Sequence, residues 1–168
     1  MRKAAGAGLI ILAFAYAGLL LVRTKKERIA LLKALSDALS GLHAELGIRL
    51  TPLPEALSFL AQSGEASGAA FFSEVSSESF GELSFRERWC LAADRELMCL
   101  TSDERNELKR LGTFLGTYEL SEQLNAISLC RAKLEHSRRR AEDELSGYTR
   151  SCIGLCISFG ILLAILLV

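Results

Sequence analysis

Ser151–Val168, which reads SCIGLCISFGILLAILLV, is the stretch that decides the fold. It contains no charged side chain. At a rise of about 1.5 Å per residue it would cover about 27 Å as a helix, which is close to the thickness of the hydrocarbon core of a bilayer. A buried helix of a soluble domain normally keeps a polar stripe, and this stretch shows none. The pattern therefore predicts a C-terminal transmembrane helix.

A second charge-free stretch, Ala4–Val22, lies near the N-terminus. Two interpretations are open. Ala13, Ala15 and Ala17 have the spacing of a signal-peptide cleavage region. The alternative is an uncleaved transmembrane helix, which we favour because the apolar run is long for a signal peptide and a basic cluster follows it directly.

Basic residues predict the orientation of both spans. They lie on the central side of each span, at Arg23, Lys25, Lys26, Arg28, Arg138, Arg139, Arg140 and Arg150. The positive-inside rule then places the central region in the cytoplasm. The sequence thus predicts an N-terminal transmembrane helix at 1–22, a cytoplasmic helical bundle at 23–150 and a C-terminal transmembrane helix at 151–168.

The composition favours helices and excludes a general affinity for nucleic acid. Lys plus Arg and Asp plus Glu each number 20, so the chain carries no net charge that would attract nucleic acid. Leu, Ala, Glu and Arg are abundant and are good helix formers, and alternating strand patterns are missing. The five cysteines form no C-x-x-C pair, which argues against a disulfide framework.

The central region shows one clear helical seam followed by shorter helices. Leucines recur at steps of three and four in about residues 24–47, at Leu32, Leu35, Leu39, Leu42 and Leu46. Further helices are expected at about residues 52–62, 67–79, 85–99 and 103–115, and from Leu120 or Ser121 onward. We predict an all-α fold, a compact bundle of about six helices flanked by N- and C-terminal transmembrane helices.

Local capping patterns mark the starts of three of these helices. Thr51 is expected to cap a helix whose first residue is Pro52, because proline is tolerated where no helical N–H bond is made. Ser84-x-x-Glu87 and Thr101-x-x-Glu104 match the capping box, in which side chain and backbone at the helix start bond each other reciprocally.

No pattern points to catalysis, to a cofactor or to a metal. His43 and His136 are far from any cysteine in sequence, and neither zinc-ligand spacing nor a P-loop occurs. The Gly112–Gly116 stretch ends a helix instead of opening one, so its glycines suit close packing and a C-cap better than a phosphate loop. Cys90, Cys99 and Cys130 are expected to pack in the core.

Two weaker patterns have both a functional and a structural interpretation. The Arg138–Arg140 cluster suits a phosphate or lipid headgroup, although its place beside a membrane span is explanation enough. Cys152, Cys156 and Gly160 are spaced four apart and form a small-residue face. Such a face permits close helix packing in a bilayer, against the first span or another protein.

Several motifs follow one another along the chain: a charged N-terminal anchor, a helix end at 45–47, the stretch TPLPEAL at 51–57, and LGTFLG at 111–116 followed by Gln123. In this order of motifs the chain resembles the stage III sporulation protein AB family of endospore-forming bacteria. The resemblance covers essentially the whole chain, which closes with a long helix and a span. One departure is Glu119, where the family pattern leads us to expect Asp.

The resemblance implies a function that the residue patterns alone do not. The family is similar to the cytoplasmic helical domain of the inner-membrane platform proteins of type II secretion and type IV pilus machines. It implies a subunit of the channel complex between mother cell and forespore, on the mother-cell side of the outer forespore membrane. Its expected partners are a secretion-type ATPase of the same complex, other membrane proteins of the channel and the lipid bilayer; a homo-oligomer is compatible with this role.

The predicted bundle has no catalytic groups and is anchored in the membrane at both ends of its sequence. Such a bundle suits a platform that passes the motion of an ATPase to neighbouring membrane proteins. Loops at one end of a bundle are accessible to a cytoplasmic partner. We therefore expect partner contact at two turns, through Thr51, Pro52, Leu53, Pro54, Glu55, Gly112, Gly116, Glu119 and Gln123; helix capping alone is the other interpretation of these residues. The alternative function is a membrane-tethered adaptor or sensor that binds a regulatory protein.

Overall fold

A computed structural model describes the backbone of residues 2–63, 66–77 and 83–167. The side chains that it describes are those of residues 22–62, 68–77 and 83–147. The chain divides into two compact units. One comprises Met1–Glu27 with Arg140–Val168, and the other comprises Arg28–Arg139. The second unit holds the candidate site.

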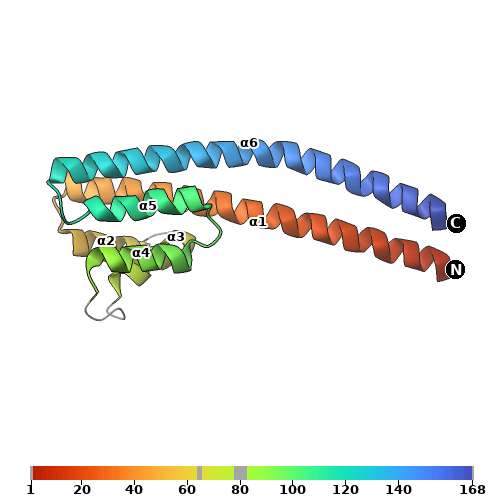
Figure 1. The fold of residues 1–168 in the computed structure, drawn as a ribbon, viewed down its shortest axis with the longest axis horizontal. Helices are drawn as coiled ribbons and strands as arrows, with labels where there is room; N and C mark the ends of the chain where they lie inside the picture. The colour runs from red at the N-terminus through yellow and green to blue at the C-terminus, as the bar shows by residue number, and fades with distance from the viewer. Residues whose placement is uncertain (1, 64–65, 78–82, 168) are drawn as a thin grey trace. The chain divides into compact units, whose positions relative to one another are not determined.

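The described backbone is all-α, as predicted, and contains six helices (Figure 1). Their bounds are α1 Arg2–Gly47, α2 Leu53–Ser63, α3 Ala66–Ser76, α4 Phe85–Glu96, α5 Ser102–Phe114 and α6 Leu120–Leu167. The two long helices, α1 and α6, each pass from one unit into the other. No helix break separates the N-terminal stretch from the leucine seam, because no Pro or internal turn signal interrupts α1.

The leucine seam of α1 forms one side of a single core. All five predicted seam leucines are buried, as are apolar side chains from each of the other helices. The core includes Leu57 and Leu60 of α2, Phe71, Phe72 and Val75 of α3, Trp89, Ala92 and Ala93 of α4, Leu108 and Leu111 of α5, and Ile127, Cys130 and Leu134 of α6. The seam's assignment to the inside of a bundle is therefore confirmed.

Trp89 is the centre of an aromatic cluster that joins α3, α4 and α5. Its ring lies edge-on to Phe71 and Phe72, with ring centroids 4.9 Å and 6.2 Å away. Its Nε1–H donates to the carbonyl of Leu108 on α5 over 2.7 Å, which satisfies the buried indole nitrogen. A Cβ on Gly112 would lie 2.4 Å from Trp89 Cδ1, so only glycine lets α5 approach the indole this closely.

Both predicted capping boxes are present at the starts of α4 and α5. Ser84 and Glu87 bond each other's backbone N–H groups, and Thr101 and Glu104 do the same. The bonds from Ser84 lower the pKa of Glu87. Local capping chemistry thus sets both helix starts where the sequence placed them.

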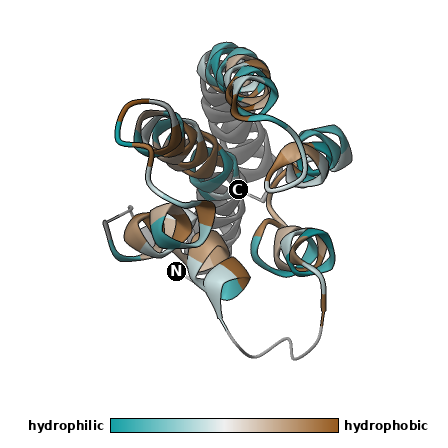
Figure 2. Ribbon diagram, turned by 90° about the vertical axis from the view of Figure 1, so that its left-hand side faces the viewer, coloured by the Kyte–Doolittle hydropathy of each residue, from teal (hydrophilic) through white to brown (hydrophobic). Residues whose placement is uncertain are grey.

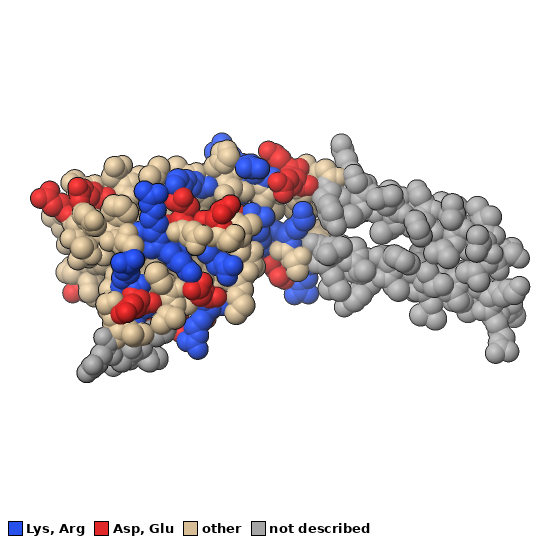
Figure 3. All heavy atoms as spheres, in the orientation of Figure 1, with Lys and Arg blue, Asp and Glu red and all other residues tan. Residues whose placement is uncertain are grey.

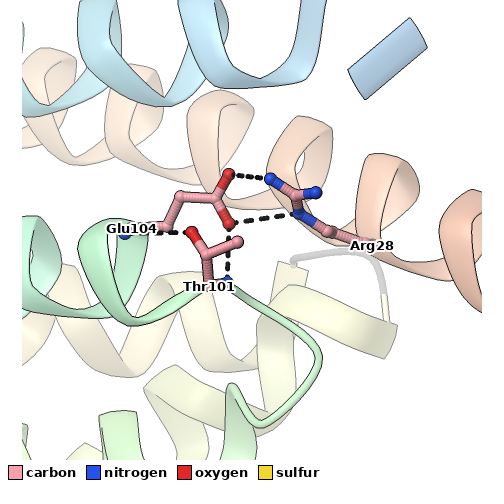
Figure 4. A network of polar contacts seen from close by, with 3 residues as sticks. All are labelled: Arg28, Thr101 and Glu104. Atoms are coloured by element: carbon pink, nitrogen blue, oxygen red, sulfur yellow. Dashed lines mark hydrogen bonds and ion pairs between the residues drawn. The ribbon is translucent and has the colours of Figure 1, made fainter. Parts of the chain in front are cut away.

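Glu104 has a second partner that capping does not require (Figure 4). Arg28 of α1 donates through Nη2 to Oε1 over 2.6 Å and through Nε to Oε2 over 3.2 Å. Burial would raise the pKa of Glu104, but the hydrogen bonds from Arg28 and Thr101 outweigh it, and the pKa lies below its ordinary value. The pair ties α1 to the start of α5, and so one predicted membrane-flanking arginine has a structural partner in the bundle.

The bounds predicted for α2 to α5 agree with the observed ones within one residue, except for two helix ends that were wrong by three residues. α2 begins at Leu53, because the Ala56 N–H bonds the Pro52 carbonyl and leaves Pro52 just outside the helix. α3 ends at Ser76, where we expected 79. α4 ends at Glu96, where we expected 99, because Leu97 leaves helical geometry and a turn follows.

In the part of the chain that the structure describes, no helix combines the length and apolar character needed to cross a bilayer. The side chains of residues 1–21 and 148–168 lie outside that part. Nearly all of the two predicted spans falls there, as do Arg150 and the predicted packing face of Cys152, Cys156 and Gly160.

Candidate partner-docking site

The turn between α1 and α2 holds two large apolar side chains in solvent. Ile48 is 80% exposed and Leu50 is 69% exposed. Leu50 has a φ of 55°, the left-handed region that residues with a Cβ rarely adopt. An exposed leucine held in a strained conformation is an uncommon combination, and strain of this kind clusters at functional sites.

Glu45 holds this turn in place. Its carboxylate is buried and accepts from Arg49 Nη1 over 2.7 Å and from Thr51 Oγ1 over 3.0 Å. Its backbone carbonyl accepts from the Thr51 N–H over 3.0 Å. Three bonds to one residue therefore fix the backbone on both sides of Leu50.

A second turn, between α5 and α6, is also fixed by one side chain. Gln123 accepts from the Gly116 N–H through Oε1 over 3.2 Å and donates from Nε2 to the Tyr118 carbonyl over 2.7 Å. Gly116 has a φ of 74°, the positive value typical of the residue that ends a helix. Next to it, Tyr118 and Leu120 are 49% and 41% exposed.

These two turns meet at one end of the bundle. A Cβ on Gly116 would lie 3.4 Å from Leu53 Cδ2, and one on Gly47 would lie 3.1 Å from Leu124 Cδ1. Figure 2 looks along the helices onto this end and shows hydrophobic and hydrophilic residues sharing each helix. We name the exposed apolar residues of this end, Ile48, Leu50, Tyr118 and Leu120, the apolar end.

Acidic side chains surround the apolar end. Glu55 opens α2, and Glu119 and Glu122 lie at the start of α6; all three are exposed. Within the described residues, none of these three carboxylates forms an ion pair. An apolar centre with a charged rim is the usual anatomy of a protein interface, and the negative rim favours a basic partner surface.

A groove beside the apolar end runs between α5 and α6. Its volume is about 260 Å³, and Phe114, Tyr118 and Leu129 are among the residues that line it. Phe114 and Tyr118 stack with ring centroids 5.2 Å apart, and Leu129 is 55% exposed. The groove is large enough for one or two apolar side chains of a partner.

The structure brings most of the predicted contact residues together, but gives them different roles. Pro52, Pro54, Glu55, Gly116 and Glu119 are exposed, whereas Thr51, Leu53 and Gln123 are half-buried. Thr51 and Gln123 hold the two turns through their hydrogen bonds. Gly112 is buried against Trp89, in the close helix packing that the sequence suggested for this glycine.

Sequence analysis missed the apolar end itself. Ile48 and Leu50 flank Arg49 directly after the seam, where we assigned them no role. The available signal was their position: two large apolar residues in a turn between Gly47 and Pro52, outside any helical period. Such residues have no core face to occupy, which leaves solvent or a partner.

The arginine cluster at the start of the predicted second span is partly neutralised. Arg138 Nη2 and Arg139 Nε bond Glu135 Oε1 over 2.6 Å and 3.3 Å. The hydrogen bond from Arg138, with that from Arg139, lowers the pKa of Glu135 to about 2. These bonds to Glu135 suit ordinary surface pairing. Figure 3 shows that Lys and Arg are interspersed with Asp and Glu on the face in view.

The three cysteines of the bundle differ in burial. Cys130 is buried, and burial together with the nearby Glu107 raises its pKa to about 12, so the thiol is unreactive. Cys90 is half-buried, and Cys99 is exposed. The expectation of core packing was therefore wrong for Cys99, because α4 ends before reaching it. Among the described residues, no cluster of His, Cys, Asp or Glu could hold a metal ion.

Comparisons with known proteins agree with the architecture. The family model described as stage III sporulation protein AB matches residues 3–168. A solved structure of stage III sporulation protein AB (SpoIIIAB) is similar, with 28% identity and a TM-score of 0.62 over 71% of this chain and 97% of its own. No curated protein matches the chain. Because the family model spans nearly every residue, the chain belongs to the stage III sporulation protein AB family.

Proposed function

We propose that the chain is a non-enzymatic membrane platform subunit of the channel complex between mother cell and forespore. In this proposal it links a cytoplasmic secretion-type ATPase to the membrane proteins of the channel and acts in spore development after engulfment. Membership of a sporulation family supports the cellular process. The proposed platform role and the link to an ATPase depend on the apolar end.

The apolar end is the observation that supports a docking role most directly. Leu50 keeps an unfavourable φ of 55° although its side chain gains nothing by burial, since it is 69% exposed. The left-handed conformation costs about 1–2 kcal/mol for a residue with a Cβ. The hydrogen bonds to Glu45 hold the backbone in this strained conformation. Burial of the Leu50 side chain by a partner would offset the strain, which is why we connect it with docking.

The position of the apolar end suits contact with a cytoplasmic assembly. Within the bundle unit, α1 runs from Arg28 to Gly47, about 28 Å at helical rise. The apolar end therefore lies a full bundle length from the boundary with the unit that contains the termini. In the proposed topology that boundary faces the membrane, and the apolar end is free to meet an ATPase.

Membrane attachment in this proposal rests on the sequence. The stretches 4–22 and 151–168 contain no charged residue, and basic residues follow the first and precede the second. Positive flanks on the central side favour two spans with the bundle in the cytoplasm. We place the protein in the outer forespore membrane, with the bundle on the mother-cell side.

The test measures recruitment of the ATPase to vesicles that contain the full-length chain. The variant carries Leu50→Asp and Tyr118→Asp, which put charge into the apolar end without touching the core. The control is Met98→Asp, because Met98 is 73% exposed and lies in the turn after α4, close to Thr101. We expect the double variant to weaken ATPase binding by about tenfold or more, as for interface hot spots, and the control to bind normally.

Retained binding by a correctly folded double variant would refute the proposed docking surface. The fluorescence of Trp89, the only tryptophan in the chain and a buried one, reports whether the bundle is intact. If no vesicle containing the wild-type chain recruits the ATPase, the platform function itself fails.

The groove between α5 and α6 favours a second candidate function, a membrane-tethered adaptor that binds a regulatory protein. This groove has an apolar part, with Phe114, Tyr118 and Leu129, and a polar part that includes Glu107, Arg110 and Glu122. It can therefore receive an amphipathic partner helix. Leu129→Asp would block this groove and leave the apolar end unchanged. Loss of function in Leu129→Asp, with normal ATPase recruitment, would favour the adaptor over the platform.

A further inference from the structure

A small pocket lies where α2, α3 and α4 meet. Its volume is about 120 Å³. Leu53 and Leu57 of α2, Val75 of α3 and Phe85 of α4 give it apolar walls, while Ser76 and Arg88 contribute polar groups. Exposed residues, Pro54 and Ser58, lie at its edge and open it to solvent.

Two buried polar atoms of this pocket, Arg88 Nε and Ser76 Oγ, lack a hydrogen-bond partner among the described residues. Buried polar atoms in native proteins are hydrogen-bonded in the large majority of cases, and an unsatisfied one calls for an explanation. A guanidinium is always charged and only donates, so what is missing beside Arg88 is an acceptor.

The neighbouring acidic side chains of α3 and α4 are already engaged. Glu87 bonds the backbone and hydroxyl of Ser84. Glu74 pairs with Arg95 over 2.8 Å. In the described part of the chain Arg88 forms no ion pair, and its buried Nε–H is costly to leave without an acceptor.

We propose that this pocket binds the carboxylate of an Asp or Glu side chain from a protein partner. A carboxylate accepts from two donors at once, and Arg88 Nε–H and the Ser76 hydroxyl supply two. The volume corresponds to about four waters at roughly 30 Å³ each, which suits a carboxylate with a short methylene stem. The apolar walls suit that stem better than they suit phosphate, which would leave most of its oxygens without a donor.

The arrival of a partner at this pocket rests on the proposed function, since Leu53 and Pro54 open α2 directly after the turn that carries Ile48 and Leu50. The chemistry of the pocket does not depend on which partner arrives. A small carboxylate therefore tests the pocket separately from ATPase docking.

The experiment titrates the full-length chain in detergent with propionate and, separately, with inorganic phosphate. Two NMR signals report binding: the Arg88 Nε–H group and the Val75 methyl groups, which also line the pocket. We expect propionate to shift both signals in a saturable manner, with a dissociation constant in the millimolar range given its few atoms. Phosphate should bind at least several-fold more weakly.

Variants connect the signal to the pocket. Arg88→Gln should abolish the propionate-dependent shift of Val75, and Ser76→Ala should weaken binding several-fold. Arg86→Gln is the matched control, because Arg86 is an exposed arginine on the same helix and should leave binding unchanged.

Three results would overturn the inference. They are no saturable shift, an equal shift in Arg88→Gln, or tighter binding of phosphate than of propionate. A fourth concerns Glu78 and Glu82, which lie outside the described residues: if replacing both with Gln moves the Arg88 signal without ligand, the chain itself supplies the acceptor. Any of these results leaves ATPase recruitment untouched, so a failure here is distinguishable from a failure of the proposed function.

Discussion

Arg28 and Glu104 lie 76 positions apart in the sequence and meet through two charge-assisted hydrogen bonds. Glu104 also caps α5, so one carboxylate fixes a helix start and fastens that helix to α1. The capping box of Thr101 and Glu104 could be predicted, because it lies within four consecutive residues. The ion pair of Glu104 with Arg28 could not be predicted, because no local pattern reveals which distant residue the fold brings close.

Replacing Glu104 with Gln should lower the free energy of unfolding at pH 7 by about 2 kcal/mol, the usual effect of losing hydrogen bonds to a charged group. The lowered pKa of Glu104 means that its stabilising effect is present above the pKa of the unfolded chain and is lost as the pH falls through the folded-state pKa. Urea denaturation followed by Trp89 fluorescence, at neutral and at acidic pH, measures both effects.

Glu107→Gln is the control for this prediction. Glu107 pairs with Lys133 over 2.7 Å with both side chains about a third exposed, so its loss should cost under about 1 kcal/mol. Equal losses in the two variants, or a Glu104→Gln effect that does not shrink on acidification, would contradict the role assigned to the Arg28–Glu104 pair.

Gly112 offers a second test at the same scale. Gly112→Ala places a Cβ 2.4 Å from the rigid indole of Trp89, and we expect a destabilisation of about 3 kcal/mol from overpacking. At Gly147, in contrast, nothing lies within 4 Å of the added Cβ, and Gly147→Ala should be neutral or slightly stabilising. A thermal melt of each full-length variant compares them; a wild-type melting temperature for Gly112→Ala would show that the helices adjust easily.

Among the elements, the turn between α1 and α2 is the one whose conformation we connect with function. Leu50→Gly should leave the free energy of unfolding unchanged or raise it by up to about 1 kcal/mol, because relief of the strain offsets the freedom gained by the unfolded chain. The same variant should lose ATPase recruitment to vesicles, because it removes an apolar side chain from the apolar end.

Leu91→Gly is a matched control, since Leu91 is 42% exposed on the surface of α4. It should cost about 1 kcal/mol, as glycine does within a helix, and leave recruitment unchanged. A large destabilisation by Leu50→Gly would mean that the leucine serves the fold. Unimpaired recruitment would mean that Leu50 has no part in docking.

Helix starts could be predicted from the sequence more accurately than helix ends. Ser84 and Thr101 each supply a side-chain acceptor for the first turn, which is a strong local signal. The end of α4 has no glycine or proline, and Leu97 is buried in the core although it has left the helix. Leu97 packs in the core after the helix has ended, and Cys99, two residues further on, is exposed instead of packed in the core.

For the whole molecule, the leucine seam and the turn signals were sufficient to predict an all-α bundle. The seam has one face, and a single buried face on a helix needs several other helices to cover it. The arrangement of the two turns that form the apolar end was expected only in outline. The strain at Leu50 and the unsatisfied atoms of Arg88 and Ser76 could not be predicted, since both depend on backbone geometry and tertiary packing.

The topology of the chain tests the central claim, a platform whose bundle faces the cytoplasm, most directly. Cys99 is exposed, so a full-length chain that keeps it as the single cysteine carries an accessible probe at a native position. A membrane-impermeant maleimide is applied to intact cells and to inverted vesicles. We predict labelling of Cys99 only in the inverted vesicles; labelling in intact cells would place the bundle outside the cytoplasm and contradict the proposed contact with an ATPase.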